Sequence, residues 1–224
     1  MAILNSATEH STPPPGPAKP SPPSSPSPQE IDAIVQSHPL TLSLRSNPTY
    51  TESRPHATTE IPDALQTQNL LTGLLAGPHA ISIPPYIFTS TDERKPRSMA
   101  MIMHLGSDVC GHPGIVHGGI IATLFDEGFA RCCFGALPHK VGVTANLNID
   151  YREPVLAGSL LVMWAEVVRV EGRKVWGRGR METMSVDGDG EDNGEGPSRL
   201  VAEASVLCVE PREAANWSSM YKAA

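Results

Sequence analysis

The stretch GIVHGGIIATLFDEG, residues 114–128, decides how the rest of the chain has to be arranged. From residue 119 to residue 134, ten of sixteen side chains are apolar with no clear polar stripe. This segment therefore predicts a helix that is covered on all sides. A sheet curled around one helix provides such cover, so we expect an α+β fold. Two strands should precede the helix and four, in a meander, should follow it: 81–90, 97–106, 141–151, 158–170, 173–184 and 199–210.

The segment 141–151 has the most regular strand pattern, because apolar and polar residues alternate strictly along it. We expect its apolar side to face the helix and its polar side to face away. The apolar set is Val143, Ala145, Leu147, Ile149 and Tyr151, and the polar set is Thr144, Asn146, Asn148 and Asp150.

Composition divides the chain into four parts. Half of the residues in 11–28 are proline, which predicts a disordered tail because such a segment buries little surface. After Pro28, acidic residues in a first turn predict a short helix at 29–38, followed by an irregular covering arm. Gly-rich residues 185–198 are expected to form a flexible loop, and Trp217 and Tyr221 to pack back on the domain. The predicted parts are 1–28 (tail), 29–80 (helix and arm), 81–212 (domain) and 213–224 (C-terminal tail).

The overall composition excludes several classes of partner. A net charge of -7 argues against nucleic acid, and the chain lacks the run of about 18 apolar residues that a membrane span needs. Four cysteines without a CxxC pair or a signal peptide indicate reduced thiols inside the cell. Cys110, His112 and His117 fit no familiar zinc spacing, so we expect no metal site. The absence of arginine before Arg45 argues against a mitochondrial presequence, which favours the cytoplasm and leaves the mitochondrion open.

His117, Gly118 and Gly119 stand where the central helix should begin. The first N–H groups of a helix have no partner within it, and the helix dipole favours negative charge there. Glycines leave room for a ligand, so this turn could bind the oxyanion that develops during acyl transfer. Alternatively, the two glycines only allow tight packing of the helix start. These residues alone leave both interpretations open.

Asp126 follows His117 by nine residues, which is about 13.5 Å along a helix and half a turn out of phase. The two side chains therefore cannot meet across one helix. A carboxylate on a buried helix is costly unless it is paired or used. If both groups serve one reaction, they must come from two chains, which predicts a symmetric homodimer or a dimer of dimers.

The motif HGGIIATLFDE, with VTANLNIDYREP downstream, resembles the hotdog-fold acyl-CoA thioesterases of the His-Gly-Gly branch. More narrowly, the chain is similar to fungal thioesterase-superfamily proteins that share ESRPH and CGHPGIVHGG. The resemblance covers about 29–212. It implies a curved antiparallel sheet around one long helix, an acyl-CoA substrate that brings its own coenzyme A, and no other cofactor.

The resemblance also implies roles for individual residues. The Gly118 N–H would polarise the thioester carbonyl, with Gly119 and Asn146 also at the substrate. Asp126 of the partner chain would be the general base or the nucleophile. Thr144 would help to hold the attacking water, and His117 would orient the glycine turn or simply pack at the helix start.

Several features depart from the resemblance or leave alternatives. Some relatives carry a polar amide where this chain has Gly111, and His112 is a conceivable substitute. Thr144 needs a bulge to turn toward the site. Glu127 is the alternative acid, about 100° around the helix. Basic residues gather in 152–180, where they could serve coenzyme A phosphates or be solvated strand charges.

Three functions from different classes follow. The first is hydrolysis of an acyl-CoA thioester to the carboxylic acid and coenzyme A. The second is a non-catalytic protein that binds acyl-CoA. The third, a hotdog dehydratase, is disfavoured because that class pairs aspartate with a histidine on another stretch, and no histidine follows His139.

Overall fold

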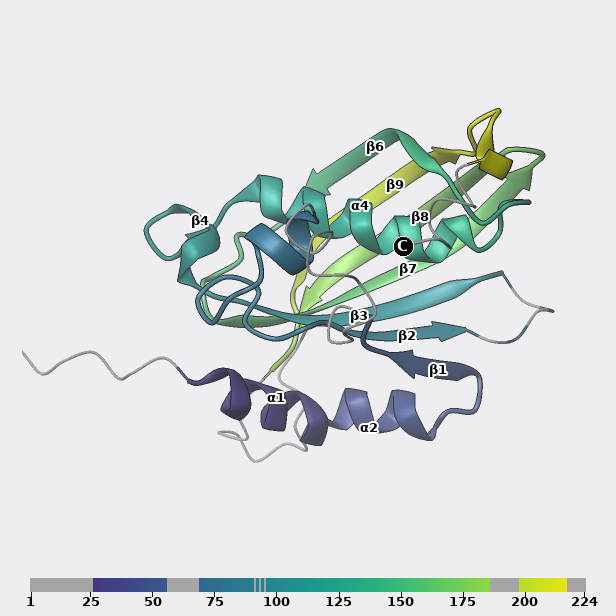
Figure 1. The fold of residues 1–224 in the computed structure, drawn as a ribbon. Coiled ribbons are helices and arrows are strands. Elements are labelled where there is room, and N and C mark those ends of the chain that lie inside the picture. Colours follow the sequence, from purple (N-terminus) through teal and green to yellow (C-terminus); the bar gives the residue numbers. More distant parts are fainter. Residues whose placement is uncertain are drawn as a thin grey trace, which may run out of the picture.

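The computed structural model describes residues 26–55, 69–90, 92, 94, 96–185 and 198–216. A seven-stranded antiparallel sheet, in the order β1-β2-β3-β7-β8-β9-β6, curves around the helix α4 (Gly118–Phe134), as Figure 1 shows. This is the hotdog architecture, and the prediction of an α+β fold with one central helix is confirmed. A short two-stranded sheet, β4 (Cys110–His112) with β5 (Ile115–Val116), precedes the helix and was not predicted.

Six strands of the main sheet coincide with the expected segments, and a seventh, at 50–53, was not expected. The exception is the segment 81–90, of which only the second half is a strand, because two prolines interrupt its first half. The strands are β1 (Tyr50–Ser53), β2 (Tyr86–Ser90), β3 (Ser98–Leu105), β6 (Val143–Tyr151), β7 (Ser159–Glu171), β8 (Lys174–Thr183) and β9 (Leu200–Val209).

The prediction that the last four strands form a meander is wrong for β6. Only β7, β8 and β9 are sequential neighbours, whereas β6 pairs with β9 and β7 pairs with β3. The helix α4 carries the chain across the concave face, so β6 completes the far edge of the sheet before the chain returns to β7 in its centre. Tyr151, on this edge strand, is 53% exposed, whereas Val143 is 42% exposed because it pairs with Val209 on the convex side, so the expectation that it faces the helix is wrong.

The concave face of the sheet and α4 enclose the main core. Leu124, Phe125 and Phe129 of α4 are fully buried against it. Close approach depends on glycine: a Cβ at Gly128 would lie 2.5 Å from Sδ of Met163, and one at Gly179 would lie 2.5 Å from the backbone oxygen of Trp164. The helix can therefore touch β7 and β8 only because these positions lack side chains.

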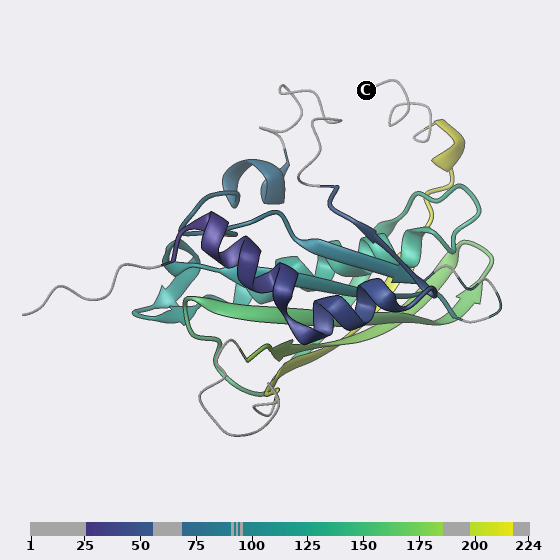
Figure 2. The ribbon, with the colours of Figure 1, turned by 90° about the horizontal axis from the view of Figure 1, so that it is seen from below.

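Two helices cover the convex face over β2, β3 and β7, as Figure 2 shows: α1 (Pro28–Ser37) and α2 (Pro39–Ser46). The short helix expected at 29–38 is confirmed, and it begins with a capping box between Ser27 and Glu30. The expectation of an irregular arm at 39–80 is wrong in part. The helix α2 begins at Pro39, a residue that suits the first position of a helix. Residues 50–53 form a strand, and a π-helical turn at Leu70–Leu74 packs Leu71 into the main core.

Some expectations fall outside the described residues: most of the proline-rich tail, residues 186–197 of the glycine-rich loop, and the packing of Trp217 and Tyr221. The four-part division of the chain stays a prediction. Among the helices of the described ranges, none combines the length and the apolar character required to span a bilayer.

Candidate active site

The first turn of α4 presents one backbone donor to its surroundings. His117 is the N-cap of the helix, and its Nδ1 accepts a hydrogen bond from the Gly119 N–H at 2.8 Å. The Ile120 N–H donates to the His117 carbonyl at 2.9 Å. Within the described part of the chain, the Gly118 N–H has no hydrogen-bond partner. The expected pair of glycine donors is therefore reduced to Gly118, because His117 already uses the second.

The His117 ring lies between two glycines that have no room for a side chain. A Cβ at Gly119 would lie 2.9 Å from Nδ1 of His117, and a Cβ at Gly111 would lie 2.8 Å from its Cδ2. Gly111 is thus a packing position for the ring. A side chain at this position would clash with the ring, and His112, the conceivable substitute, is exposed.

Tyr151 holds the other side of the same turn. Its hydroxyl donates to the Gly118 carbonyl at 2.8 Å, and its ring would meet a Cβ at Gly118 at 3.5 Å. Tyr151, Gly118 and Ile121 are among the residues that line a hollow of about 230 Å³ beside the helix start. The sequence pattern placed Tyr151 only on the apolar side of its strand. A hydroxyl at the end of an apolar face was the available signal, since it needs a partner.

Asp126 lies on an exposed part of α4, and it forms no hydrogen bond or ion pair with any described residue. The expectation of a costly buried carboxylate is therefore wrong for the isolated chain. The alternative acid, Glu127, forms an ion pair with Arg131 one helical turn later at 2.6 Å. Of the two acids, Asp126 is the one that the structure leaves available.

A bulge in β6 turns Thr144 toward the helix. The register of β6 against β9 shifts between Thr144 and Asn146, so that Thr144 pairs with Cys208 and Asn146 pairs with Leu207. Paired residues share a face of the sheet, and Cys208 is buried on the helix side. The bulge that Thr144 needs in order to face the site is thus present. Asn146 remains on the convex side, where it accepts a hydrogen bond from Asn148.

Cys208, which pairs with Thr144 across β9 and β6, is one of three buried cysteines. Hydrogen bonding with Cys133 and burial raise the pKa of Cys208. Hydrogen bonding with Cys132, together with burial, raises the pKa of Cys133 to about 12. These thiols are therefore neutral, and all four cysteines are free. The described residues contain no cluster of three or more His, Cys, Asp or Glu side chains suited to a metal ion.

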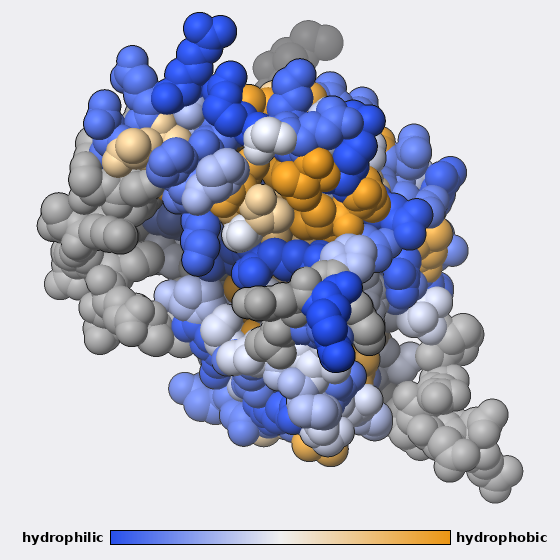
Figure 3. All heavy atoms as spheres, turned by 90° about the vertical axis from the view of Figure 1, so that its right-hand side faces the viewer, coloured by the Kyte–Doolittle hydropathy of each residue, from blue (hydrophilic) through white to orange (hydrophobic). Residues whose placement is uncertain are grey.

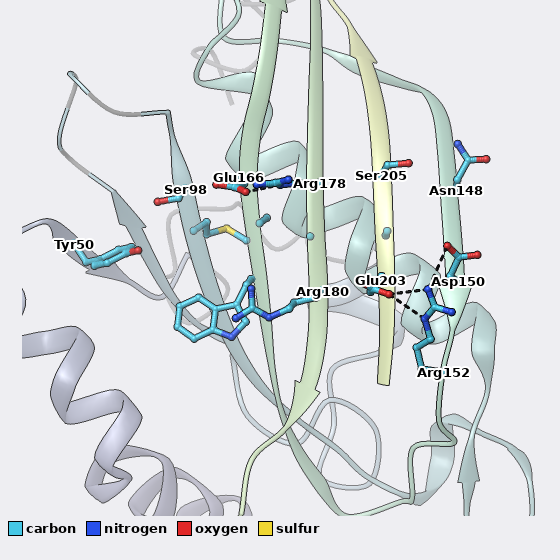
Figure 4. A pocket seen from close by; sticks show the side chains of 15 residues that line it. Tyr50, Ser98, Asn148, Asp150, Arg152, Glu166, Arg178, Arg180, Glu203 and Ser205 are labelled. Atoms are coloured by element: carbon cyan, nitrogen blue, oxygen red, sulfur yellow. Dashed lines mark hydrogen bonds and ion pairs between the residues drawn. The ribbon is translucent and has the colours of Figure 1, made fainter. Parts of the chain in front are cut away.

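Most of the basic residues between 152 and 180 are already neutralised by acids. A hollow of about 700 Å³ lies on the convex face. Arg178 pairs there with Glu166, and Arg152 pairs with Glu203 at 2.7 Å; Figure 4 shows both pairs. Arg180 pairs with Glu182 at 2.8 Å. Arg178 and Arg180 lie on the side of the sheet away from α4. This arrangement favours the interpretation of solvated strand charges.

Comparison with known proteins identifies relatives of this chain. The family model for the thioesterase superfamily matches residues 113–182, which include α4 and β6. A protein of Candida albicans named as mitochondrial and uncharacterized is 35% identical over 151 residues, covering 67% of this chain and 64% of that protein. An uncharacterized protein of Schizosaccharomyces pombe is 36% identical over 133 residues, covering 59% of this chain and 70% of that protein.

A third similarity connects the chain to a protein with a named activity. Acyl-coenzyme A thioesterase THEM4 of Rattus norvegicus is 41% identical over 71 residues, which are 32% of this chain and 30% of that protein. The chain spans less than two thirds of the length of the C. albicans and rat relatives.

Proposed function

Because this chain belongs to the thioesterase superfamily, we propose that it hydrolyses an acyl-CoA thioester to the free carboxylic acid and coenzyme A. The name of the rat relative supports acyl-CoA as the substrate class. The proposed chemistry uses a backbone N–H, a carboxylate and water, so it requires no metal or redox cofactor.

The Gly118 N–H carries the proposal. It stands at the positive end of a helix of 17 residues, and it has no partner among the described residues. A thioester carbonyl that accepts this hydrogen bond gains negative charge on its oxygen as water attacks the carbon. A fixed donor aimed at this developing charge lowers the barrier. His117 and Tyr151 would hold the turn from its two sides by their bonds to Gly119 and Gly118.

Asp126 of a partner subunit would remove the proton from the attacking water, and Thr144 would hold that water by its hydroxyl. Within one chain, the start of α4 and Asp126 are separated along the helix, so a second copy has to supply one of them. The free edge of β6 supports pairing with another copy, since an exposed edge presents unpaired backbone groups. Gly119, whose N–H is bonded to His117, and Asn146, which lies on the convex side, are assigned to the substrate by the resemblance alone.

The first experiment measures release of free thiol from short, long and aromatic acyl-CoAs. Asp126→Asn should lower turnover by orders of magnitude, whereas Glu127→Gln, the matched neutralisation one position later, should retain it. Coenzyme A esters that bind without hydrolysis would instead identify a non-catalytic binding protein. Full activity in Asp126→Asn would remove Asp126 from the mechanism.

A mixing experiment tests whether the site is shared between subunits. Asp126→Asn and Gly118→Pro are each expected to be inactive alone. Random exchange makes half of the dimers mixed, each with one intact site of two, so about one quarter of the wild-type activity should return. If mixing restores nothing although light scattering shows exchanged dimers, both groups act within one chain.

The proposed location is intracellular. The name of the C. albicans relative places that protein in the mitochondrion, so the mitochondrion is the compartment to examine first. Fractionation of cells that express this chain shows whether the protein is recovered with the mitochondria or with the cytoplasm.

A further inference from the structure

A cavity of about 820 Å³ lies at the C-terminal end of α4, remote from Gly118 along the helix axis. Its walls are formed by β1, the end of β2, the residues just before β3, the loop after α4 and the second half of β7. Figure 3 faces this end of the molecule, where an apolar area borders hydrophilic side chains. The cavity is lined by Thr51, Thr89, Ser90, Asp92, Pro96, Arg97, Gly135, Ala136, Lys140, Val167 and Val170.

Arg97 is held in the cavity wall without a carboxylate partner among the described residues. Its carbonyl accepts from the Val167 N–H at 2.8 Å, which fixes the backbone. Its guanidinium lies against the backbone of Gly135, where an added Cβ would be 2.6 Å from Cζ. The Arg97 Nε is buried and has no hydrogen-bond partner in the described part of the chain. The glycine that ends α4 therefore makes room for a guanidinium whose buried Nε is not satisfied within the described protein.

Lys140 brings a second cation to the same cavity. It is the single non-glycine residue with positive φ among the described residues, at 58°, and its N–H donates to the Leu137 carbonyl at 3.1 Å. An exposed non-glycine residue in this conformation is uncommon. The acid in the lining, Asp92, pairs with Arg94 at 3.0 Å. Among the described residues that line the cavity, Arg97 and Lys140 thus outnumber the one acid.

The remaining polar groups also suit a phosphate. Ser90, Thr89 and Thr51 supply hydroxyl groups that can donate to an anion. Guanidinium and ammonium groups together with hydroxyls are the usual protein donors to phosphate oxygens. The arginines of the convex face differ in this respect, because their charges are offset by Glu166, Glu203 and Glu182.

We propose that this cavity binds a phosphate-bearing group through Arg97 and Lys140. Resting on the proposed function, the first source of that group is the nucleotide end of the substrate's coenzyme A. Gly135 follows Asp126 by nine residues, about 13.5 Å along the helix axis. In an acyl-CoA, the extended pantetheine chain separates the thioester from the phosphates. When the thioester lies at Asp126, the phosphates therefore need a binding site some distance away. A separate phosphorylated ligand is the second source.

The test compares a full acyl-CoA with the same acyl group on N-acetylcysteamine, which lacks the nucleotide. Arg97→Gln and Lys140→Gln should each raise KM for the acyl-CoA, relative to that for the short thioester, by about tenfold, the factor expected for one lost charge-assisted hydrogen bond. Arg178→Gln removes an equal charge from the convex face and should leave the ratio unchanged. Lys140 is exposed, so its variant remains informative even if Arg97→Gln folds poorly.

Calorimetric titration with adenosine 3′,5′-bisphosphate and with inorganic phosphate separates the two sources and does not need turnover. Weaker binding in both variants with a raised KM ratio supports coenzyme A as the source. Weaker binding of inorganic phosphate with an unchanged ratio supports a separate phosphorylated ligand. Equal binding by wild type and both variants overturns the proposal. If wild type hydrolyses no thioester, the proposed function fails, while the titration still tests the cavity.

Discussion

The Nδ1 atom of His117 accepts a hydrogen bond from the Gly119 N–H at 2.8 Å. Because of this contact, Gly118 and Gly119 differ in which backbone N–H group is still available. Gly119 completes the N-cap of α4, whereas Gly118 lines the hollow beside Tyr151. Because Nδ1 is the acceptor, the neutral ring carries its proton on Nε2. With Nδ1 used by the N-cap, we expect the ring to orient the turn.

Gly118→Pro tests the donor itself. Proline removes the N–H but suits the first position of a helix, and the extended backbone of His117, with ψ of 131°, is compatible with a following proline. We expect normal folding with kcat lower by roughly 10²–10³, the cost of an oxyanion donor. Circular dichroism and thiol release measure the two effects, and unchanged turnover would exclude Gly118 as the donor.

His117→Ala should destabilise the protein by about 1 kcal/mol, because the helix loses its N-cap bond. His117→Asn keeps a side-chain acceptor and should recover most of that loss. Urea unfolding of both variants gives the comparison. Equal loss in alanine and asparagine variants would mean that the ring acts through its packing against Gly111 and not through the cap.

Tyr151→Phe removes the hydroxyl that bonds the Gly118 carbonyl. One neutral hydrogen bond contributes about 1 kcal/mol, so we expect kcat to fall about fivefold. KM should remain unchanged because the ring still lines the hollow. Steady-state kinetics distinguish this from a binding defect, which would appear as a raised KM with an intact kcat.

Gly179→Ala tests the contact between β8 and the central helix. The added Cβ would lie 2.5 Å from the backbone oxygen of Trp164 and 3.2 Å from the Phe129 ring. Overpacking of this kind costs about 1–3 kcal/mol, which a thermal melt detects. Gly77→Ala is the matched control, since a Cβ added at Gly77 would have no atom within 4 Å. Equal melting temperatures for the two variants would contradict the packing argument.

Stability should fall on acidification because of His104. Burial is the main cause that lowers the pKa of this imidazole, while a backbone hydrogen bond at Gly158 opposes it. The unfolded chain takes up the proton near its ordinary pKa of about 6.5, and the folded chain does so only at lower pH. Between these values the unfolded state binds more protons, so the free energy of unfolding decreases as pH falls, by at most about 1.4 kcal/mol per unit.

Urea titrations between pH 7.5 and 5.5 measure this slope in wild type and in His104→Gln. His104→Gln is expected to lose the part of the pH slope that comes from His104, even if the variant differs from wild type in absolute stability. A slope that is identical in the two proteins would assign the pH dependence to other groups.

The order of apolar residues determined the central helix and the curved sheet around it. A helix with no polar stripe must be buried all round, and β6 alternates because a strand alternates its faces. Candidate residues His117, Gly118 and Asp126 followed from the same stretch, since helix geometry fixes where an N-terminus and a carboxylate can lie.

Only the tertiary structure decided which groups are available. Sequence spacing could not show that His117 occupies the Gly119 N–H, that a bulge turns Thr144 to the helix side, or that Asp126 is exposed. It also could not place Arg97 and Lys140 in the wall of one cavity, because the two come from segments far apart in the chain. Local pattern specifies an element and its faces, whereas partners across elements depend on strand order and register, which form only when the whole sheet closes around α4.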